Sequence, residues 1–340
     1  MLRLPDFNYI RPKSLKEAAA ALADMGPEAM AVAGGTDVYP KMKRGQFNPR
    51  HLVSLRSLPE LRGLRSEDKE GFWIGAGETL TDVAQDRAVA ELFPALSHAA
   101  GSVSTPQLRN MGTIGGNVFV DTRCNYYDQT HFWRKAAGFC MKKDGDICLV
   151  APKSKICLAV FSSDTAPVLC SLGATAVLVG REGSHRIPFD QLYRDDGIDF
   201  LTKRGDELLQ GILIPRKVFG CRNVYLKLRR RGSFDFPVLG VAAAMGFNAE
   251  GLCSSAKVVL TAVSSAPAIV DVARSLEGKK VTRERILAVA EAAAKVSHPV
   301  DNADLDYWYR KRMTKVYTER ALSLLAGLES EPEKVSGAPL

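Results

Sequence analysis

Four of the seven cysteines lie close together in the middle of the chain, at Cys124, Cys140, Cys148 and Cys157. The stretches between them contain 15, 7 and 8 residues, so the spacing of zinc ribbons and that of bacterial ferredoxins are both absent. Four thiolates can still bind a metal centre, which would hold a long loop in one conformation. The residues favour a metal site, and unligated cysteines or a redox disulfide are the alternatives that the spacing leaves open.

The segment that carries these cysteines is basic and aromatic. From residue 122 to residue 158 there are seven Lys and Arg residues against three Asp residues. Its aromatic side chains are Tyr126, Tyr127, Phe132, Trp133 and Phe139. A basic surface favours an acidic protein partner, because complementary charge guides docking.

Two Gly-Gly turns have the composition of phosphate-binding loops. The first is AGGTD at residues 33–37, after a predicted strand, and the second is TIGGN at residues 113–117. Glycine lets backbone N–H groups approach an anion without a Cβ atom in the way, and a Thr hydroxyl can add a hydrogen bond. Neither turn fits G-x-G-x-x-G or G-x-x-x-x-G-K-[ST], which disfavours a Rossmann site or a P-loop. Each alone could be a tight turn, but two such turns could hold the two halves of a pyrophosphate.

A third motif, SDTAP, follows at residues 163–167. With AGGTD, TIGGN and SDTAP in this order, the chain resembles the FAD-binding subunits of the molybdenum hydroxylases over about residues 3–325. The segment from Tyr225 to Ala242 is also similar to that family. The resemblance implies an α+β fold of mixed α/β type, with a two-subdomain FAD-binding domain and a smaller C-terminal α+β domain.

The resemblance also implies which residues bind FAD. Asp164 resembles an aspartate that contacts the cofactor, Lys227 aligns with a lysine near the flavin, and Val103 falls where a side chain often lies against the flavin. Asp37 and Asp164 could equally be ordinary helix caps. The two implied pyrophosphate loops consist of Val32, Ala33, Gly34, Gly35, Thr36 and Asp37, and of Thr113, Ile114, Gly115, Gly116 and Asn117.

The cysteine segment is an insertion between the second and third motifs. Asn117 and Asp164 are 47 residues apart, whereas the two motifs lie much closer together in most members of the family. One branch, the 4-hydroxybenzoyl-CoA reductases, carries a [4Fe–4S] cluster on such an insertion. The four cysteines of the insertion match the ligands of that cluster in number and order. The remaining Cys170, Cys221 and Cys253 are expected to be buried or partly buried cysteines without a metal.

Resemblance to this branch implies an electron relay. Electrons would pass from ferredoxin through [4Fe–4S] and FAD to [2Fe–2S] clusters and a molybdenum–pterin site in partner subunits, where 4-hydroxybenzoyl-CoA loses its phenolic hydroxyl. The implied assembly is a heterohexamer of two αβγ units, with a large molybdopterin subunit and a small [2Fe–2S] subunit. The chain has no recognisable acid–base or nucleophile constellation, so no catalytic residue is expected in it. The alternatives are the FAD subunit of another molybdenum hydroxylase with an extra cluster, and a zinc-stapled FAD-binding interaction module.

The pattern of turns and periodic segments predicts the domain limits. A first FAD-binding subdomain, a small βαβ unit, would span residues 1–57, and a second would span 58–218 with the iron–sulfur insertion at about 122–158. The C-terminal domain would span 219–326, followed by a disordered tail at 327–340. One long helix is predicted at 89–104. In the last helix, Tyr307, Met313, Tyr317, Ala321 and Leu324 recur at helical spacing and are expected in the core.

Composition and charge exclude several classes of protein. The net charge of +8 is spread along the chain, and its dense stretches, 229–231 and 310–312, lack the aromatic platforms of nucleic-acid binding proteins. There is no run of 18 apolar residues and no apolar signal core at the N-terminus, so neither a transmembrane helix nor secretion is expected. A cytoplasmic protein with reduced thiols is therefore predicted.

Overall fold

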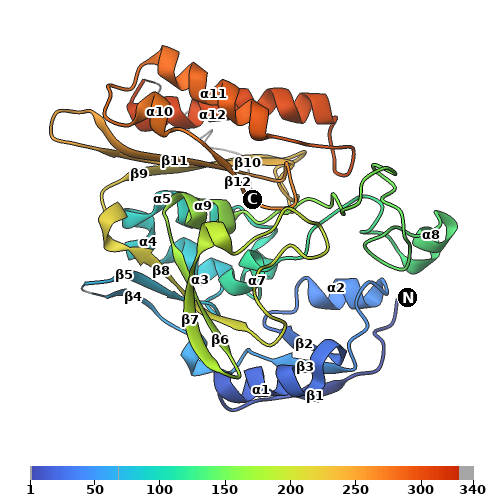
Figure 1. Cartoon of the computed structure of the whole chain (residues 1–340). Coiled ribbons are helices and arrows are strands. Elements are labelled where there is room, and N and C mark those ends of the chain that lie inside the picture. Colours follow the sequence, from blue (N-terminus) through green and yellow to red (C-terminus); the bar gives the residue numbers. More distant parts are fainter. Residues whose placement is uncertain (1, 68, 329–340) are drawn as a thin grey trace.

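The computed structural model describes residues 2–67 and 69–328. These residues form three β-sheets, each built from its own stretch of sequence and each covered by helices (Figure 1). The sheets take their strands from residues 8–54, 64–215 and 222–270. This mixed α/β architecture confirms the predicted fold class, and the domain limits at 57/58 and 218/219 fall between the sheets.

The first sheet is the small parallel βαβ unit that the sequence predicts. Its strands β1 (Asn8–Ile10), β2 (Ala29–Val32) and β3 (His51–Ser54) pair in the order β1-β3-β2. Helix α1 (Leu15–Met25) begins at the predicted cap, because Ser14 Oγ accepts a hydrogen bond from the N–H of Glu17 at 3.1 Å. The first Gly-Gly turn leaves the end of β2 and enters α2 (Val38–Lys43). It therefore lies at the carboxyl end of a parallel strand, where open α/β sheets bind ligands.

The second sheet is antiparallel throughout, with the strand order β4-β5-β8-β6-β7. Its strands are β4 (Leu64–Glu67), β5 (Gly71–Gly75), β6 (Thr175–Gly180), β7 (Gly183–Pro188) and β8 (Leu208–Pro215). Its helices are α3 (Leu80–Gln85), α4 (Arg87–Leu92), α5 (Pro94–Gly101), α6 (Pro106–Arg109), α7 (Ile114–Val118) and α9 (Thr165–Ser171). Short 3-10 turns lie at Gly26–Glu28, Pro59–Leu61, Phe189–Gln191 and Arg216–Val218.

The single helix predicted at 89–104 is wrong, because the chain forms α4 and α5 instead. Phe93 leaves the helical conformation, with φ −133° and ψ 60°, and Pro94 is the first residue of α5. Proline has no N–H to donate inside a helix and is favoured at its first position. The apolar period continues across the break, which is why the pattern alone does not reveal it.

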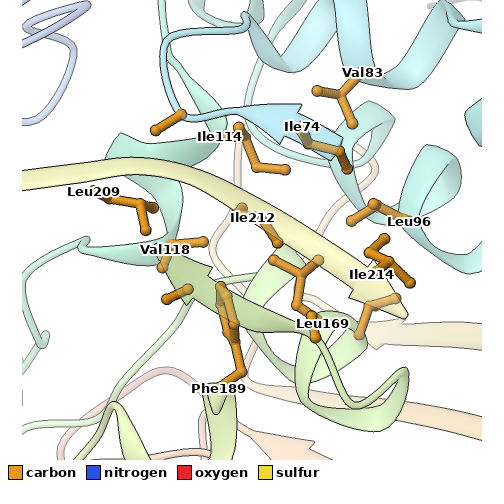
Figure 2. Packing of buried hydrophobic residues seen from close by; sticks show 14 of the residues in the cluster. Ile74, Val83, Leu96, Ile114, Val118, Leu169, Phe189, Leu209, Ile212 and Ile214 are labelled. Carbon is orange, nitrogen blue, oxygen red and sulfur yellow. The ribbon is translucent and has the colours of Figure 1, made fainter. Parts of the chain in front are cut away.

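Strand β8 runs through the middle of the second sheet and contributes to the largest hydrophobic core. Ile212 and Ile214 are fully buried, and Figure 2 shows them among Leu96 of α5 and Leu169 of α9. Burying an aliphatic side chain of this size stabilises the fold by about 1.5–3 kcal/mol. Val118 of α7 belongs to the same core (Figure 2), so the helices that carry the second and third motifs are fixed to the sheet.

The third sheet has helices on both faces. Its antiparallel strands β9 (Arg222–Leu228), β10 (Leu239–Phe247), β11 (Cys253–Thr261) and β12 (Ala268–Val270) pair in the order β12-β11-β10-β9. Helices α10 (Ala273–Leu276), α11 (Arg283–Val296) and α12 (Tyr307–Ala326) cover the outer face (Figure 1). Helices α5 and α9 contact strands β9 to β11, and so join this domain to the second sheet.

The predicted core face of α12 is confirmed in part. Ala321 is fully buried, and Met313 and Tyr317 pack against the C-terminal core. Tyr307, however, is 38% exposed, while Arg310, Thr314 and Thr318 are fully buried. The guanidinium of Arg310 donates to the carbonyl oxygens of Val238 and Val300 at 3.0 Å each and to that of Ala262. Burial lowers the pKa of Arg310 to about 10, so it stays charged at neutral pH. A polar stripe can therefore face a core when its donors find backbone acceptors.

The insertion is held in place by side chains rather than by regular structure. Its one helix among the described residues is α8 (His131–Ala136). Arg134 is buried, and its guanidinium donates to the carbonyl oxygens of Arg44 and Gly45 at 3.3 and 3.0 Å. The side chain of Gln46 donates to the carbonyl oxygen of Tyr127 at 2.9 Å. The insertion thus packs against the N-terminal unit just after α2.

Two further predictions concern the ends of the chain and membranes. Helix α12 ends at Gly327, whose φ of +70° makes it a left-handed cap, and most of the predicted disordered tail, from 329 on, lies outside the described residues.

None of the helices in the described ranges combines the length and the apolar character needed to cross a bilayer.

Replacing Arg310 by Ala tests whether its buried hydrogen bonds fasten α12. Three backbone carbonyl groups would lose their donor, and we expect the free energy of unfolding to fall by about 3 kcal/mol. Urea denaturation followed by circular dichroism measures the change. Arg312→Ala, at an exposed position of the same helix, is the control and should leave the midpoint unchanged. Equal midpoints for both variants would contradict the role given to Arg310.

Candidate functional site

A cavity of about 630 Å³ lies between the N-terminal unit, the second sheet and the C-terminal domain. This volume is in the range of ligand and cofactor pockets. Its lining includes most of the residues that the sequence singles out, namely Ala33, Gly34, Gly35, Thr36, Asp37, Val103, Thr113, Gly115, Gly116, Asn117 and Asp164. Three motifs far apart in the sequence therefore meet around one space.

The first Gly-Gly turn presents free donors to this cavity. Within the described part of the chain, the backbone N–H groups of residues 33–37 have no protein acceptor. Gly34 is required by a close approach, because a Cβ atom there would lie 1.8 Å from the carbonyl oxygen of Met111. That approach brings the two glycine turns together. Unpaired N–H groups on a glycine turn are suited to bind phosphate oxygens.

The second Gly-Gly turn differs from the expected cradle of N–H groups. The N–H groups of Ile114 and Gly115 donate to the carbonyl oxygens of Glu78 and Ala76, and that of Gly116 donates to Thr113 Oγ. A Cβ atom at Gly115 would lie 2.8 Å from the carbonyl oxygen of Ala76, so this glycine is needed for packing. Gly116 is exposed, and a Cβ atom added there would meet only Thr113 Oγ, at 3.1 Å. Gly116, rather than Gly115, gives the cavity an uncovered backbone.

Asn117 joins the second motif to the third. Its side-chain oxygen accepts hydrogen bonds from Ser163 Oγ at 2.8 Å and from the hydroxyl and N–H of Thr165 at 2.7 and 3.2 Å. Ser163 Oγ in turn accepts from the N–H of Ala166 at 3.0 Å. Ser163 and Asn117 therefore supply the caps of α9, and the side chain of Asp164 makes no cap bond there.

Asp164 instead ties the cavity to the C-terminal domain. Its carboxylate accepts hydrogen bonds from the Tyr225 hydroxyl at 2.7 Å and from Lys227 Nζ at 3.0 Å, both on β9. Lys227 also donates to the carbonyl oxygen of Ser102, next to Val103. Burial raises the pKa of Asp164 and lowers that of Lys227, because both charged forms lose water. Lys227 holds the carboxylate of Asp164 in place through this hydrogen bond but does not itself line the cavity.

Two other predicted contacts lie in the core rather than at the cavity. Val32 is buried with Met42 and Leu52, and Ile114 is fully buried in the main core. Neither lines the cavity. Each is an apolar residue next to a glycine turn, and its motif position alone suggested a role in binding. The hydrophobic effect places such side chains inside, which leaves the neighbouring backbone to face the ligand.

The four cysteines of the insertion lie in one region of the structure, and Cys124, Cys140 and Cys157 belong to one small buried cluster. Cys124, Cys140, Cys148 and Cys157 are buried and free of disulfides. Burial raises the pKa of Cys124 to about 12, and the nearby Cys140 and Cys157 thiols also raise it. Burial likewise raises the pKa of Cys157, with a contribution from Cys148 and Cys140. Within residues 2–67 and 69–328, no three His, Cys, Asp or Glu side chains are spaced to ligate a single metal ion.

Arg123 connects the cavity, the cysteines and the C-terminal domain. Its guanidinium pairs with Asp37 at 3.2 Å and with Asp128 at 3.3 Å, and lies 3.8 Å from the centre of the Phe236 ring. Arg123 and Phe236 both line the cavity, and Arg123 directly precedes Cys124. Sequence reasoning missed this clamp, because nothing local to residue 123 indicates a partner in the C-terminal domain.

Replacing Gly116 by Val tests whether the cavity holds the FAD that the motifs imply. The added Cβ atom would meet only Thr113 Oγ, at 3.1 Å, so a small shift of that hydroxyl can accommodate it, but the side chain would block the phosphate groups. We expect at least tenfold less FAD to be retained per chain, measured by absorbance after gel filtration. Gly232→Val, at an exposed glycine with open space outside the cavity lining, is the matched control. Full flavin content in the Gly116 variant would remove the second turn from the binding site.

Comparisons with known proteins agree with this geometry. Residues 5–217 match the family described as the FAD binding domain in molybdopterin dehydrogenase, and residues 223–325 match the CO dehydrogenase flavoprotein C-terminal domain. The chain is 29% identical to the carbon monoxide dehydrogenase medium chain of Hydrogenophaga pseudoflava, over 94% of this chain and 96% of that protein. It is 31% identical to the FAD-binding subunit of an Escherichia coli aldehyde oxidoreductase, over 72% and 79% of the two chains.

The fold is similar as well. A solved structure of the Hydrogenophaga pseudoflava carbon monoxide dehydrogenase superposes with a TM-score of 0.78 at 28% identity, covering 94% of this chain and 97% of that one. The match to a family over more than half of the chain, the shared fold and the cavity built from the three motifs lead to one conclusion. The chain belongs to the FAD-binding subunits, or medium chains, of the molybdenum hydroxylase and CO dehydrogenase family, and is an oxidoreductase subunit.

Proposed function

We propose that this chain is the electron-relay subunit of a ferredoxin-dependent molybdenum enzyme of the 4-hydroxybenzoyl-CoA reductase type. In this proposal Cys124, Cys140, Cys148 and Cys157 ligate a [4Fe–4S] cluster, and the cavity holds FAD. The observation that carries the proposal is the gathering of these four buried thiols in an insertion beside the cavity. The site residues, the cytoplasmic location and the three-part division of the chain are part of the same proposal.

The chemistry of the side chains suits an iron–sulfur cluster. Four cysteine thiolates are a common ligand set for a [4Fe–4S] cluster. The Cys140 and Cys157 thiols raise the pKa of Cys124, and the Cys148 and Cys140 thiols raise that of Cys157, which indicates that the four side chains lie near one another. The metal content of the protein separates this proposal from the zinc-stapled alternative. When bound, an iron–sulfur cluster would supply one-electron transfer to the flavin.

The protein's own residues place the two sites next to each other. Asp37 of the first turn pairs with Arg123, the neighbour of Cys124. Asp121, three residues before Cys124, lines the cavity and bonds Lys41 of α2 at 2.5 Å. Residues at the edge of the cavity are therefore bonded to residues at the edge of the thiol set. Such proximity suits transfer of single electrons between the two.

The exposed side chains of the insertion suit an acidic electron donor. Lys135, Lys153 and Lys155 are exposed, and Phe132 is 83% and Ile147 54% exposed. Exposed cations and apolar side chains in one segment favour a small acidic ferredoxin, through charge complementarity at encounter and apolar burial on docking.

The substrate chemistry would take place in a partner subunit. Two electrons from two reduced ferredoxins, with two protons, would convert 4-hydroxybenzoyl-CoA into benzoyl-CoA, and the hydroxyl oxygen would leave as water. The partners in this proposal are a large molybdopterin subunit and a small [2Fe–2S] subunit, in a heterohexamer of two αβγ units. The alternative of a substrate-oxidising enzyme with the same extra cluster would run electrons in the opposite direction. An assay of the complex with reduced ferredoxin and 4-hydroxybenzoyl-CoA separates the two alternatives. The reductase reduces FAD with electrons from ferredoxin and converts the substrate, whereas the substrate-oxidising enzyme does not.

Replacing Cys140 by Ser tests the metal site directly. We expect loss of the broad visible absorbance of the cluster near 400 nm and of its bleaching on reduction, while the flavin content stays at the wild-type level. Cys221→Ser, at a half-buried cysteine outside the insertion, should keep both. A Cys140 variant that keeps its iron would contradict the assignment. Loss of iron and flavin together would show that the insertion supports the whole cavity.

A further inference from the structure

A buried lysine lies between the thiols and the cavity. The side chain of Lys142 is only 6% exposed. Its ammonium donates to Asp121 Oδ1 at 2.8 Å, to Thr122 Oγ at 2.7 Å and to the carbonyl oxygen of Gly197. Three acceptors from two separate segments hold one cation, which leaves its position little freedom.

Gly197 brings this cation to the sulfur of Cys157. The N–H of Gly197 donates to the carbonyl oxygen of Cys157 at 2.8 Å, and a Cβ atom at Gly197 would lie 2.8 Å from Cys157 Sγ. The carbonyl oxygen of Gly197 accepts hydrogen bonds from the Lys142 ammonium and from the Thr122 hydroxyl. Lys142 also follows Cys140 by two residues. The backbone of Gly197 therefore links the ammonium of Lys142 to Cys157.

The carboxylate next to Lys142 is shared with a second buried lysine. Asp121 accepts hydrogen bonds from Lys41 Nζ at 2.5 Å and from the Tyr127 hydroxyl at 3.0 Å, as well as from Lys142. The centre of the Tyr127 ring is close to both ammonium groups, 4.8 Å from that of Lys41 and 4.9 Å from that of Lys142. Lys41 has further carboxylates at 3.9 and 4.0 Å, whereas Asp121 is the one carboxylate bonded to Lys142 within the described ranges.

Lys142 shares its one carboxylate with Lys41, and a buried cation whose charge is only partly balanced destabilises the fold unless another negative group lies close by. Ligating thiolates carry negative charge, and a reduced iron–sulfur cluster carries one more electron than an oxidised one. A fixed cation stabilises the more negative state of a nearby group, and the effect is strong where water is excluded. Lys142 meets both conditions, since it is buried and held beside Cys157.

We propose that Lys142 is a positioning residue for electron transfer, whose fixed charge, oriented by Asp121, favours the reduced state of the group bound by the four cysteines. The inference rests on the proposed function, because it needs the cysteines to hold a redox-active cluster. In this inference Lys142 and Asp121, which are not ligands, control the reduction potential of the cluster. The sign of the effect follows from charge alone. Removing the positive charge makes reduction harder, and removing the negative charge of Asp121 makes it easier.

The experiment is a redox titration of the full chain, purified without oxygen and followed by the electron paramagnetic resonance signal of the reduced cluster. We expect Lys142→Gln to shift the midpoint potential to a more negative value and Lys142→Arg to keep it close to that of the wild type. Lys143→Gln is the matched control, because Lys143 is the next residue, is 31% exposed and has Asp144 as its one ion-pair partner within the described ranges. It should leave the potential unchanged.

A second variant separates charge from loosened packing. Asp121→Asn should shift the potential in the opposite direction, to a more positive value, whereas general loosening of the insertion would move both variants the same way. The rate of iron loss to a chelator gives an independent readout, and we expect it to rise several-fold in Lys142→Gln only. If Lys142→Gln does not fold, the direction of the Asp121→Asn shift still decides.

The outcomes distinguish this inference from the function on which it rests. Wild-type protein without iron and sulfide would overturn the proposed function. Wild-type protein with a cluster whose potential is the same in Lys142→Gln and Lys143→Gln would overturn the inference alone. Shifts of the same sign in Lys142→Gln and Asp121→Asn would also overturn it.

Discussion

The carboxylate of Asp121, placed between the ammonium groups of Lys41 and Lys142, is the interaction on which the arrangement of the two sites depends. The side chains of the two lysines are 1% and 6% exposed and that of Asp121 is 14% exposed, and the attraction of the lysines holds the pKa of Asp121 below its usual range although desolvation opposes this. Lys41 comes from the helix that follows the first glycine turn, and Lys142 comes from the cysteine segment. Breaking such a network by removing one partner leaves a buried charge uncompensated. The insertion can therefore do without much regular structure and still keep its place.

Charged and aromatic contacts also connect the cavity to the C-terminal sheet and the loop that follows β9. Asp164 receives Tyr225 and Lys227 from the C-terminal sheet, and Phe236 lies under the guanidinium of Arg123. The backbone approach of Gly34 to Met111 brings the two glycine turns together. Residues from the regions of all three sheets thus line the cavity, and charged or aromatic contacts connect these regions. A cofactor held there would depend on all three regions being folded.

Motif order and residue type allowed much of this to be predicted from the sequence. Residues of all three motifs line one cavity, and the four cysteines of the insertion are buried. Partners from distant parts of the chain could not be predicted in the same way. Nothing next to Arg123 indicates Phe236, and the donors of the second turn are engaged by Ala76 and Glu78, which no motif includes. Hydrophobic periodicity predicted only part of the buried face of α12, since Arg310 is buried through hydrogen bonds to distant backbone.

The family membership and the fold support FAD binding by this chain, and the proposed function adds an iron–sulfur cluster on the insertion. The central claim is that the insertion exists to hold an iron–sulfur cluster beside the flavin. The most direct measurement is the content of iron, zinc, acid-labile sulfide and flavin per chain in protein purified without oxygen. The account predicts about four iron, about four sulfide and one FAD. One zinc ion per chain, or flavin with neither iron nor sulfide, would contradict it.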